Sequence, residues 1–122
     1  MYLGFTFDRP ILMTDFTGTD DDFRRLINEL PACLVYCSTN NCSVCTALKP
    51  KIDELIRNEF PQIKLISLLL NQYPEIAGQY HVFAAPTILV FFNGQEFIRK
   101  TRSFGVNELK SELLRPYQLL FS

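Results

Sequence analysis

The sequence has no tryptophan, a single histidine and only four cysteines among its 122 residues. A metal centre built from several histidines is therefore excluded. Four cysteines are also too few for a disulfide-stapled secreted scaffold of this length. In a cytosolic chain, such cysteines more often bind metal or take part in catalysis, so their positions are the first place to look for function.

Long apolar runs and strong charge are missing as well. No stretch approaches the roughly 18 apolar residues of a transmembrane helix, and the formal net charge is -1. Binding to nucleic acid or to an anionic membrane is not expected, because either partner favours a basic face. The opening residues, MYLGFTFDRPILMTDF, lack a basic segment followed by a long apolar run. We therefore expect no signal peptide and a cytoplasmic location.

The composition that is present is that of an ordinary globule, 48% hydrophobic and 20% charged. The length is close to that of one domain, and no internal repeat or low-complexity tract divides the chain. We therefore expect residues 1–122 to form a single domain. The apolar tail RPYQLLFS could pack on the core or form a dimer contact. Packing on the core is favoured, and a monomer is expected.

Strand and helix patterns alternate along the chain. Strands are predicted for PILMTDF (10–16), ACLVYCS (32–38), IKLISLLL (63–70), PTILVFFN (86–93) and EFIRKTR (96–102). Helices are predicted for TGTDDDFRRLINELP (17–31), for 43–58, for a short segment after residue 73 and for GVNELKSELLRPY (105–117). The order β-α-β-α-β-α-β-β-α predicts an α/β fold. Its central, mixed and mostly parallel sheet should carry helices on both faces.

Local signals support several of these elements. Thr19 can cap the first helix, with Asp22 three residues later as a weak capping box, and Pro31 ends it. Pro50 lies inside the second helix, where a kink is expected. Asn93-Gly94 is typical of the turn of a hairpin, which should add an antiparallel edge to the sheet.

Cys42 and Cys45 lie in the segment STNNCSVCTALKP, between a buried strand and a helix. Open α/β sheets place their chemistry at such junctions. Free N–H groups at a helix N-terminus stabilise a thiolate, and can lower a thiol pKa from about 8.5 to roughly 3.5–7.5. We expect Cys42, which precedes the helix, to attack a disulfide or accept a thiol. The more buried Cys45 should resolve the mixed disulfide.

Two other interpretations of the cysteines remain. With Cys37, the pair gives C-x4-C-x2-C, which is similar to a plant-type iron–sulfur sequence. Such sites take a fourth cysteine from further downstream, and none follows Cys45, so no metal is expected. Alternatively the cysteines are inert. That reading suits Cys33 and Cys37, which share one face of an apolar strand. It suits the pair less well, because polar residues flank it.

The ordered set of motifs resembles the thioredoxin family over nearly the whole chain. Cys42 and Cys45 take the active-site places, and Pro50 matches the proline of the active-site helix. NQYP matches the segment after the central strand, AAPT matches the loop of the family's cis-proline, and FFNG matches the following strand and turn.

The resemblance implies a thioredoxin fold and a redox-active disulfide between Cys42 and Cys45, with no other cofactor. It implies a cis peptide bond before Pro86, which would otherwise be a plain proline starting a strand. The residue before that proline, Ala85, would pair through its backbone with an extended substrate. The residues expected to bind substrate are Asn41, Ser43, Val44, Ala85, Thr87 and Arg102.

The departures from the family are informative. Ser43-Val44 replaces the usual Gly-Pro between the cysteines, and Asn41 replaces the tryptophan before them. Tyr36 stands in place of a buried acid and Ser67 in place of a buried lysine. Arg102 replaces a glycine of the substrate-facing loop. Loss of the acid removes a negative charge behind the pair. We therefore expect a more acidic Cys42 and a weaker reductant than a general thioredoxin.

The predicted function is that of a thiol–disulfide oxidoreductase acting on protein disulfides or dithiols, with an unidentified electron donor or acceptor. The alternative is a thioredoxin-fold module that binds partners without catalysis. Arg102 and Asn41 on the expected substrate face, together with the missing acid, favour that alternative somewhat.

Overall fold

A computed structural model describes residues 12–122 of the chain. Its strands are β1 (Thr14–Asp15), β2 (Ala32–Ser38), β3 (Lys64–Leu69), β4 (Thr87–Phe92) and β5 (Gln95–Thr101). Its helices are α1 (Asp20–Glu29), α2 (Ser43–Glu59), α3 (Pro74–Gln79) and α4 (Val106–Phe121). The element order is the predicted one. The first strand is shorter than the predicted 10–16 segment, whose first two residues lie outside the described part of the chain.

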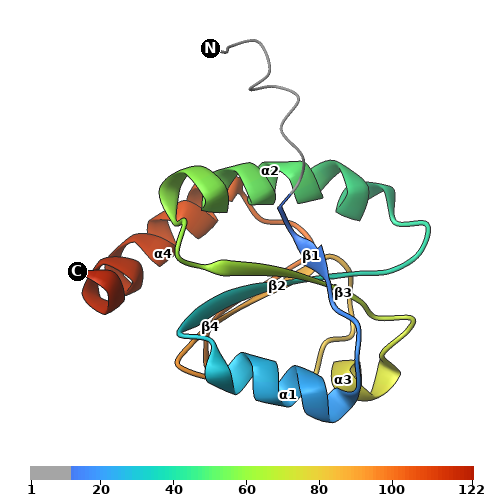
Figure 1. Cartoon of the computed structure of the whole chain (residues 1–122). Helices are drawn as coiled ribbons and strands as arrows, with labels where there is room; N and C mark the ends of the chain where they lie inside the picture. Colours follow the sequence, from blue (N-terminus) through green and yellow to red (C-terminus); the bar gives the residue numbers. More distant parts are fainter. Residues whose placement is uncertain (1–11) are drawn as a thin grey trace, which may run out of the picture.

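The strands form one sheet in the order β1-β3-β2-β4-β5. β1 and β2 run parallel to β3, whereas β4 is antiparallel to both β2 and β5. Helices α2 and α4 cover one face of the sheet, and α1 and α3 cover the other (Figure 1). The predicted hairpin does occupy one edge. Antiparallel pairing nevertheless begins in the interior of the sheet, because β4 pairs directly with the central β2.

The local signals act as the sequence indicates. The Thr19 side chain accepts a hydrogen bond from the Asp22 backbone N–H, and the Asp22 carboxylate accepts one from the Thr19 N–H, which completes a capping box. Asn93 and Gly94 have φ values of 53° and 82°. Positive φ at both turn residues is typical of a two-residue hairpin with the twist of its strands.

Alternation along β2 divides the core into two clusters. Leu34 and Tyr36 point into the cluster beneath α2 and α4. Cys33, Val35 and Cys37 point into the cluster beside α1 and α3. Because β2 is buried on both faces, it reads in sequence as one continuous apolar run.

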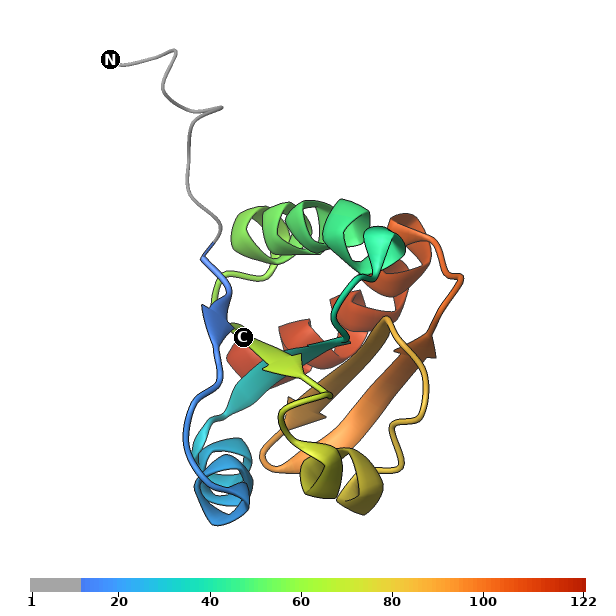
Figure 2. The ribbon, with the colours of Figure 1, turned by 90° about the vertical axis from the view of Figure 1, so that its right-hand side faces the viewer.

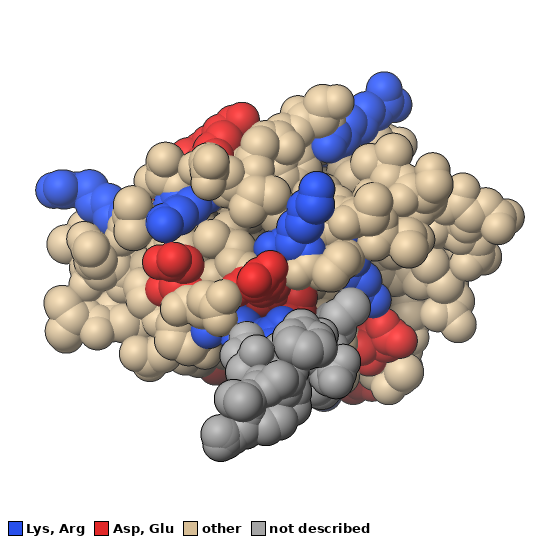
Figure 3. Space-filling model, turned by 90° about the horizontal axis from the view of Figure 1, so that it is seen from above, with Lys and Arg blue, Asp and Glu red and all other residues tan. Residues whose placement is uncertain are grey.

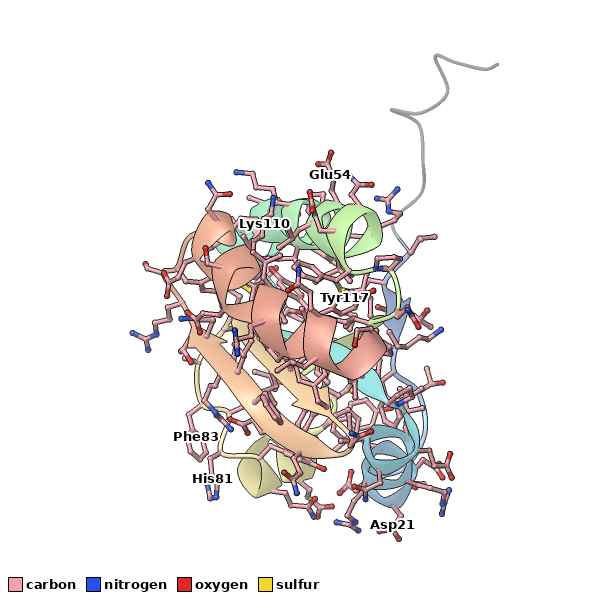
Figure 4. The ribbon with its side chains drawn as sticks, turned by 90° about the vertical axis from the view of Figure 1, so that its left-hand side faces the viewer. Asp21, Glu54, His81, Phe83, Lys110 and Tyr117 are labelled. Carbon is pink, nitrogen blue, oxygen red and sulfur yellow. A yellow bond between two sulfur atoms is a disulfide. The ribbon has the colours of Figure 1, made fainter. Side chains whose placement is uncertain are left out.

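The closing helix is longer than predicted and takes in the apolar tail. α4 continues through Pro116 to Phe121. The Tyr117 hydroxyl accepts a 3.1 Å hydrogen bond from the Gln62 backbone N–H, and the Tyr117 ring lies 5.1 Å from that of Phe60. Figure 4 shows Tyr117 on α4, on the side of the helix toward α2. The tail therefore packs on the core, as expected. No helix within residues 12–122 is long and apolar enough to cross a membrane.

Candidate redox site

The cysteine pair lies where the central strand β2 ends and α2 begins. Cys42 is the N-cap residue of α2, and Cys45 lies in the first turn. The two residues form a disulfide, with Cα atoms 5.2 Å apart. Figure 2 looks onto this end of the sheet, where the start of α2, the segment before β4 and the loop from β5 to α4 come together. Three segments distant in sequence therefore surround the disulfide.

The two sulfur atoms have different surroundings. Cys42 is partly exposed, whereas Cys45 is only 3% exposed. Cys42 Sγ accepts a 3.1 Å hydrogen bond from the backbone N–H of Cys45, which is one of the free donors of the helix N-terminus. After reduction, the same donor and the helix dipole would stabilise a thiolate on Cys42. The geometry therefore suits Cys42 for attack and Cys45 for resolution.

Tyr36 lies behind the disulfide, in the core under α2. Its side chain is 0% exposed, and its hydroxyl donates a 2.6 Å hydrogen bond to the backbone carbonyl of Cys45. Burial raises the pKa of Tyr36 to about 12, so the phenol is neutral at physiological pH. The resemblance to the thioredoxin family implied that Tyr36 lies behind the pair, and the structure places it there. The bond to the Cys45 carbonyl was beyond what the sequence could indicate.

The loop before β4 faces the pair. The Ala85-Pro86 peptide bond is cis, as the resemblance implies. The Thr87 hydroxyl donates a 2.6 Å hydrogen bond to the Ala84 carbonyl, and the Arg102 N–H donates a 2.7 Å bond to the Pro86 carbonyl. Thr87 is only 1% exposed. Its side chain is enclosed, so a contact between Thr87 and a substrate, which stays a prediction, would be made through the backbone. Thr87 shapes the loop from within, because its hydroxyl is turned toward the backbone.

The other residues expected to bind substrate are accessible. Asn41, Ser43 and Arg102 are exposed, and Val44 is 60% exposed. Ala85 is partly buried beside the cis bond. Asn41 adopts a left-handed conformation with φ 59°, which asparagine tolerates better than most residues. The structure therefore brings five of the six expected substrate residues to one accessible face.

Two hollows flank this loop. One, of about 520 Å³, lies between α2 and the loop after β5, and its lining includes Val44, Leu48, Lys51, Pro86, Arg102 and Phe104. The other, of about 540 Å³, is lined by residues that include Thr39, Asn71, Phe83, Ala84 and Arg102. Ala85 and Arg102 line both hollows. An extended chain passing over Ala85 would therefore have a hollow on either side.

Sequence reasoning missed three residues of this face. Phe83 is 80% exposed, and Figure 4 shows it projecting from the molecule beside His81. Lys51 lines the first hollow, about two turns along α2. The Asn71 side chain accepts a 2.9 Å hydrogen bond from the Asn40 N–H, which ties down the loop before Cys42. Of these three residues, only Phe83 could have been noticed in the sequence, because it is a large apolar residue directly before Ala84-Ala85-Pro86.

The remaining cysteines are apart from the site. Cys33 and Cys37 are 0% exposed and face the α1 side of the sheet. Burial raises the pKa of each thiol to about 12. Within residues 12–122, no group of three or more histidine, cysteine, aspartate or glutamate side chains is placed to hold a metal ion. Cys37 does not join the pair in a cluster, because it points to the opposite face.

The disulfide lies at the start of a helix and faces a cis-proline loop at the end of a mixed sheet. This fold and site are those of proteins that exchange thiols and disulfides. A family model described as thioredoxin matches residues 15–115. The chain belongs to the thioredoxin family.

Individual relatives agree with this placement. The chain is 31% identical over 109 residues to the thioredoxin-like protein YdfQ of Bacillus subtilis (strain 168), a match that covers 88% of this chain and 96% of YdfQ. It is 30% identical over 97 residues to a thioredoxin of Rickettsia felis, a match that covers 78% of this chain and 89% of that thioredoxin.

Solved structures share the fold. Thioredoxin NaTrxh from Nicotiana alata has a TM-score of 0.75 at 18% identity, with 88% of this chain and 94% of that chain covered. The oxidized form of mitochondrial thioredoxin 3 from Saccharomyces cerevisiae has a TM-score of 0.72 at 22% identity, with 81% of this chain and 92% of that chain covered. The predicted thioredoxin fold is confirmed.

Proposed function

We propose that this protein is a thiol–disulfide oxidoreductase that exchanges disulfides of protein substrates through the Cys42–Cys45 couple. The observation that carries the proposal is the position of Cys42 Sγ, which accepts the Cys45 N–H at the α2 N-terminus and remains partly exposed. A sulfur so placed is reachable by a substrate and is stabilised as an anion.

In the reducing direction, the Cys42 thiolate attacks one sulfur of the substrate disulfide. A mixed disulfide forms and the other substrate sulfur leaves as a thiolate. Cys45, in its thiolate form, then attacks Cys42 Sγ, which releases the second substrate thiol and closes the Cys42–Cys45 disulfide. An external dithiol reductant returns the pair to its reduced form. Ala85, beside the cis bond, would hold the substrate backbone during the first attack.

The redox poise should differ from that of a general thioredoxin. The residue behind the pair is a neutral Tyr36 in place of a buried acid, so no buried negative charge at that place opposes the thiolate. A stabilised thiolate favours the reduced form, which makes the disulfide a stronger oxidant and the dithiol a weaker reductant. The reduction potential of the couple, measured against glutathione, would test this.

The function itself is tested by the reduction of insulin with dithiothreitol as the electron source. Wild-type protein should accelerate precipitation of the insulin B chain, and Cys42→Ser should not. If the two proteins give equal rates, the oxidoreductase proposal fails.

A second candidate is a non-catalytic binding module on the same fold. The specific observation in its favour is the altered substrate face, with Arg102 at a glycine position and Asn41 at the tryptophan position. Such a module would bind its partner equally well after Cys42→Ser and Cys45→Ser replacement, and would show no turnover of insulin.

We further propose that the protein works in the cytoplasm as a monomer, with protein disulfides or dithiols as substrates and without a cofactor beyond its own disulfide. The absence of any basic patch motif in the sequence and a net charge of -1 support partners other than nucleic acid or membrane. The electron donor would be a dithiol of a separate protein.

A further inference from the structure

The substrate face carries two cations that form no ion pair with the described residues 12–122. Lys51 and Arg102 both line the hollow between α2 and the loop after β5. Neither takes part in any of the ion pairs found among residues 12–122. No acidic side chain of the described chain lines this hollow or the one beside it. Among the described residues, the immediate surroundings of the cis-proline loop therefore carry positive charge without an acidic side chain to balance it.

The positive charge beside the cis-proline loop stands out against the distribution of charge on the surrounding surface. Figure 3, which looks down on α2, shows basic and acidic side chains interspersed, with uncharged surface prevailing toward the end where α2 begins. The lining of the first hollow is otherwise largely apolar, with Val44, Leu48 and Phe104 among its residues. A charge at the edge of an apolar surface is less screened than one in open water.

The backbone of Arg102 adopts a conformation that residues other than glycine disfavour. Its φ is 62°, in the left-handed region that favours glycine. Its backbone N–H is fixed to the Pro86 carbonyl at 2.7 Å, so the loop geometry is imposed by the site. The Cβ atom of any residue other than glycine makes this conformation less favourable, and residues with such backbone strain gather at binding and active sites.

We propose that Arg102 and Lys51 make the protein selective for disulfides flanked by acidic residues. Arg102 borders both hollows and shares them with Ala85. A carboxylate next to the substrate cysteine would meet the Arg102 guanidinium as the substrate backbone passes Ala85, and Lys51 would attract a second carboxylate along α2. This selectivity rests on the oxidoreductase function proposed above, and Arg102 and Lys51 act as specificity-determining residues for it.

The test uses peptides with one internal disulfide that differ only beside a cysteine, where they carry Asp, Asn or Lys. Dithiothreitol supplies the electrons, and kcat/KM is measured at low and high salt. For wild-type protein we expect Asp to exceed Asn by about fivefold at low ionic strength and Lys to be the poorest substrate. The preference should shrink in high salt, because exposed charges are screened.

Variants assign the effect to residues. The Asp-to-Asn ratio should approach one in Arg102→Gly combined with Lys51→Ala, and it should persist in Arg102→Lys, which keeps the charge. Lys64→Ala is the matched control. Lys64 is exposed and lies at the opposite end of the sheet, beside Cys33 on β2, so its loss should leave the ratio intact.

A single-turnover measurement separates docking from recycling. In a Cys45→Ser background, the rate of mixed-disulfide formation with each peptide should show the same preference. Equal rates with the Asp and Asn peptides would overturn the selectivity and leave the oxidoreductase function standing. A preference that survives in the double variant would overturn the assignment to Arg102 and Lys51. No reaction with any peptide would overturn both the selectivity and the function.

Discussion

The hydroxyl of Tyr36 donates a 2.6 Å hydrogen bond to the backbone carbonyl of Cys45. This bond joins the middle of β2 to the first turn of α2, directly behind the disulfide. Tyr36 therefore has two roles in the fold. It fills the core beneath α2, and its buried hydroxyl finds an acceptor in the Cys45 carbonyl. It performs both without bringing a charge to the site.

Tyr36→Asp should raise the pKa of Cys42. A buried, ionised carboxylate behind the pair would disfavour the nearby thiolate. The rate of Cys42 alkylation in the reduced protein, followed against pH, should show a midpoint higher by about one unit or more. Tyr36→Phe is the control, because it removes the hydroxyl without adding charge. A midpoint that is unchanged or lower in Tyr36→Asp would mean that position 36 has no electrostatic contact with the pair.

Tyr36→Phe should destabilise the fold. The buried hydrogen bond from the Tyr36 hydroxyl to the Cys45 carbonyl would be lost, at a cost of about 0.5–1.5 kcal/mol. Denaturant unfolding of the oxidised protein measures this loss. Tyr80→Phe is a useful comparison, because Tyr80 is only partly buried and its ring packs edge-on against Phe23 and Phe91. The loss of its hydroxyl should cost less. Equal costs would show that the bond to Cys45 contributes nothing particular.

Cys45→Ser should trap substrates. Without the resolving thiol, a mixed disulfide on Cys42 has no fast intramolecular exit. Pull-down from the native lysate should give adducts that a reductant releases. The control is Cys42→Ser, which should capture little, because Cys45 is only 3% exposed. Capture of the same proteins by Cys42→Ser would reverse the two roles.

Cys33 and Cys37 should resist alkylation in the native protein. Burial raises the pKa of both thiols to about 12, so they are protonated at neutral pH as well as inaccessible. Mass spectrometry after timed iodoacetamide treatment of the reduced protein should show Cys42 labelled long before either. Rapid labelling of Cys33 or Cys37 would show that the sheet opens under native conditions.

The same thiols should make the fold sensitive to alkali. Their pKa values in the folded chain, about 12, lie above the ordinary value of 9.0, so the unfolded chain loses these protons first. The stabilising contribution is complete below about pH 9 and is lost as pH rises toward 12. Thermal unfolding between pH 8 and 11 should therefore decline less steeply in Cys33→Ala than in wild type. Parallel declines would refute the linkage.

Asp53→Ala should be strongly destabilising. Asp53 is 0% exposed, and its carboxylate accepts 2.8 Å hydrogen bonds from the Arg57 guanidinium and the Met13 backbone N–H. Removal of one partner of a buried pair costs about 3–5 kcal/mol, because the other charge is left unpaired. Asp15→Ala is the control: Asp15 is exposed, and its pair with Lys49 is long, at 3.9 Å. A cost within 1 kcal/mol for Asp53→Ala would contradict this account.

The sequence was sufficient for those parts of the structure that depend on short-range pattern. The bounds of β2, the capping box at Thr19 and the turn at Asn93-Gly94 follow from local chemistry. Side-chain partners across long separations did not follow. Asp53 bonds to an N–H 40 residues away, and its polar position on a helix gave no sign of burial. The placement of β4 beside β2 depends on the tertiary arrangement, which alternation along the chain cannot specify.

Some residues of the site could likewise be predicted from the sequence, and others could not. The cysteines and the cis-proline loop stand out as motifs, whereas Lys51 is an ordinary helix residue until α2 is set against the loop after β5. The burial of the Thr87 side chain did not follow from the sequence either. Its place next to the cis-proline suggests an accessible side chain, but in the register of β4 it pairs with Cys37 on the neighbouring strand and is buried.

The separation of the cysteines by the sheet has a consequence for how the protein matures. Cys37 is only five residues from Cys42 in sequence, yet its thiol points into the α1 side, whereas the active pair opens onto the end of the sheet. Four cysteines allow three complete pairing patterns in an unfolded chain. Once β2 is paired on both sides, only the Cys42–Cys45 bond is within reach. A chain that folds before it meets an oxidant thus has one disulfide isomer available, whereas a nascent chain that has formed any other pairing must reshuffle before the sheet can close.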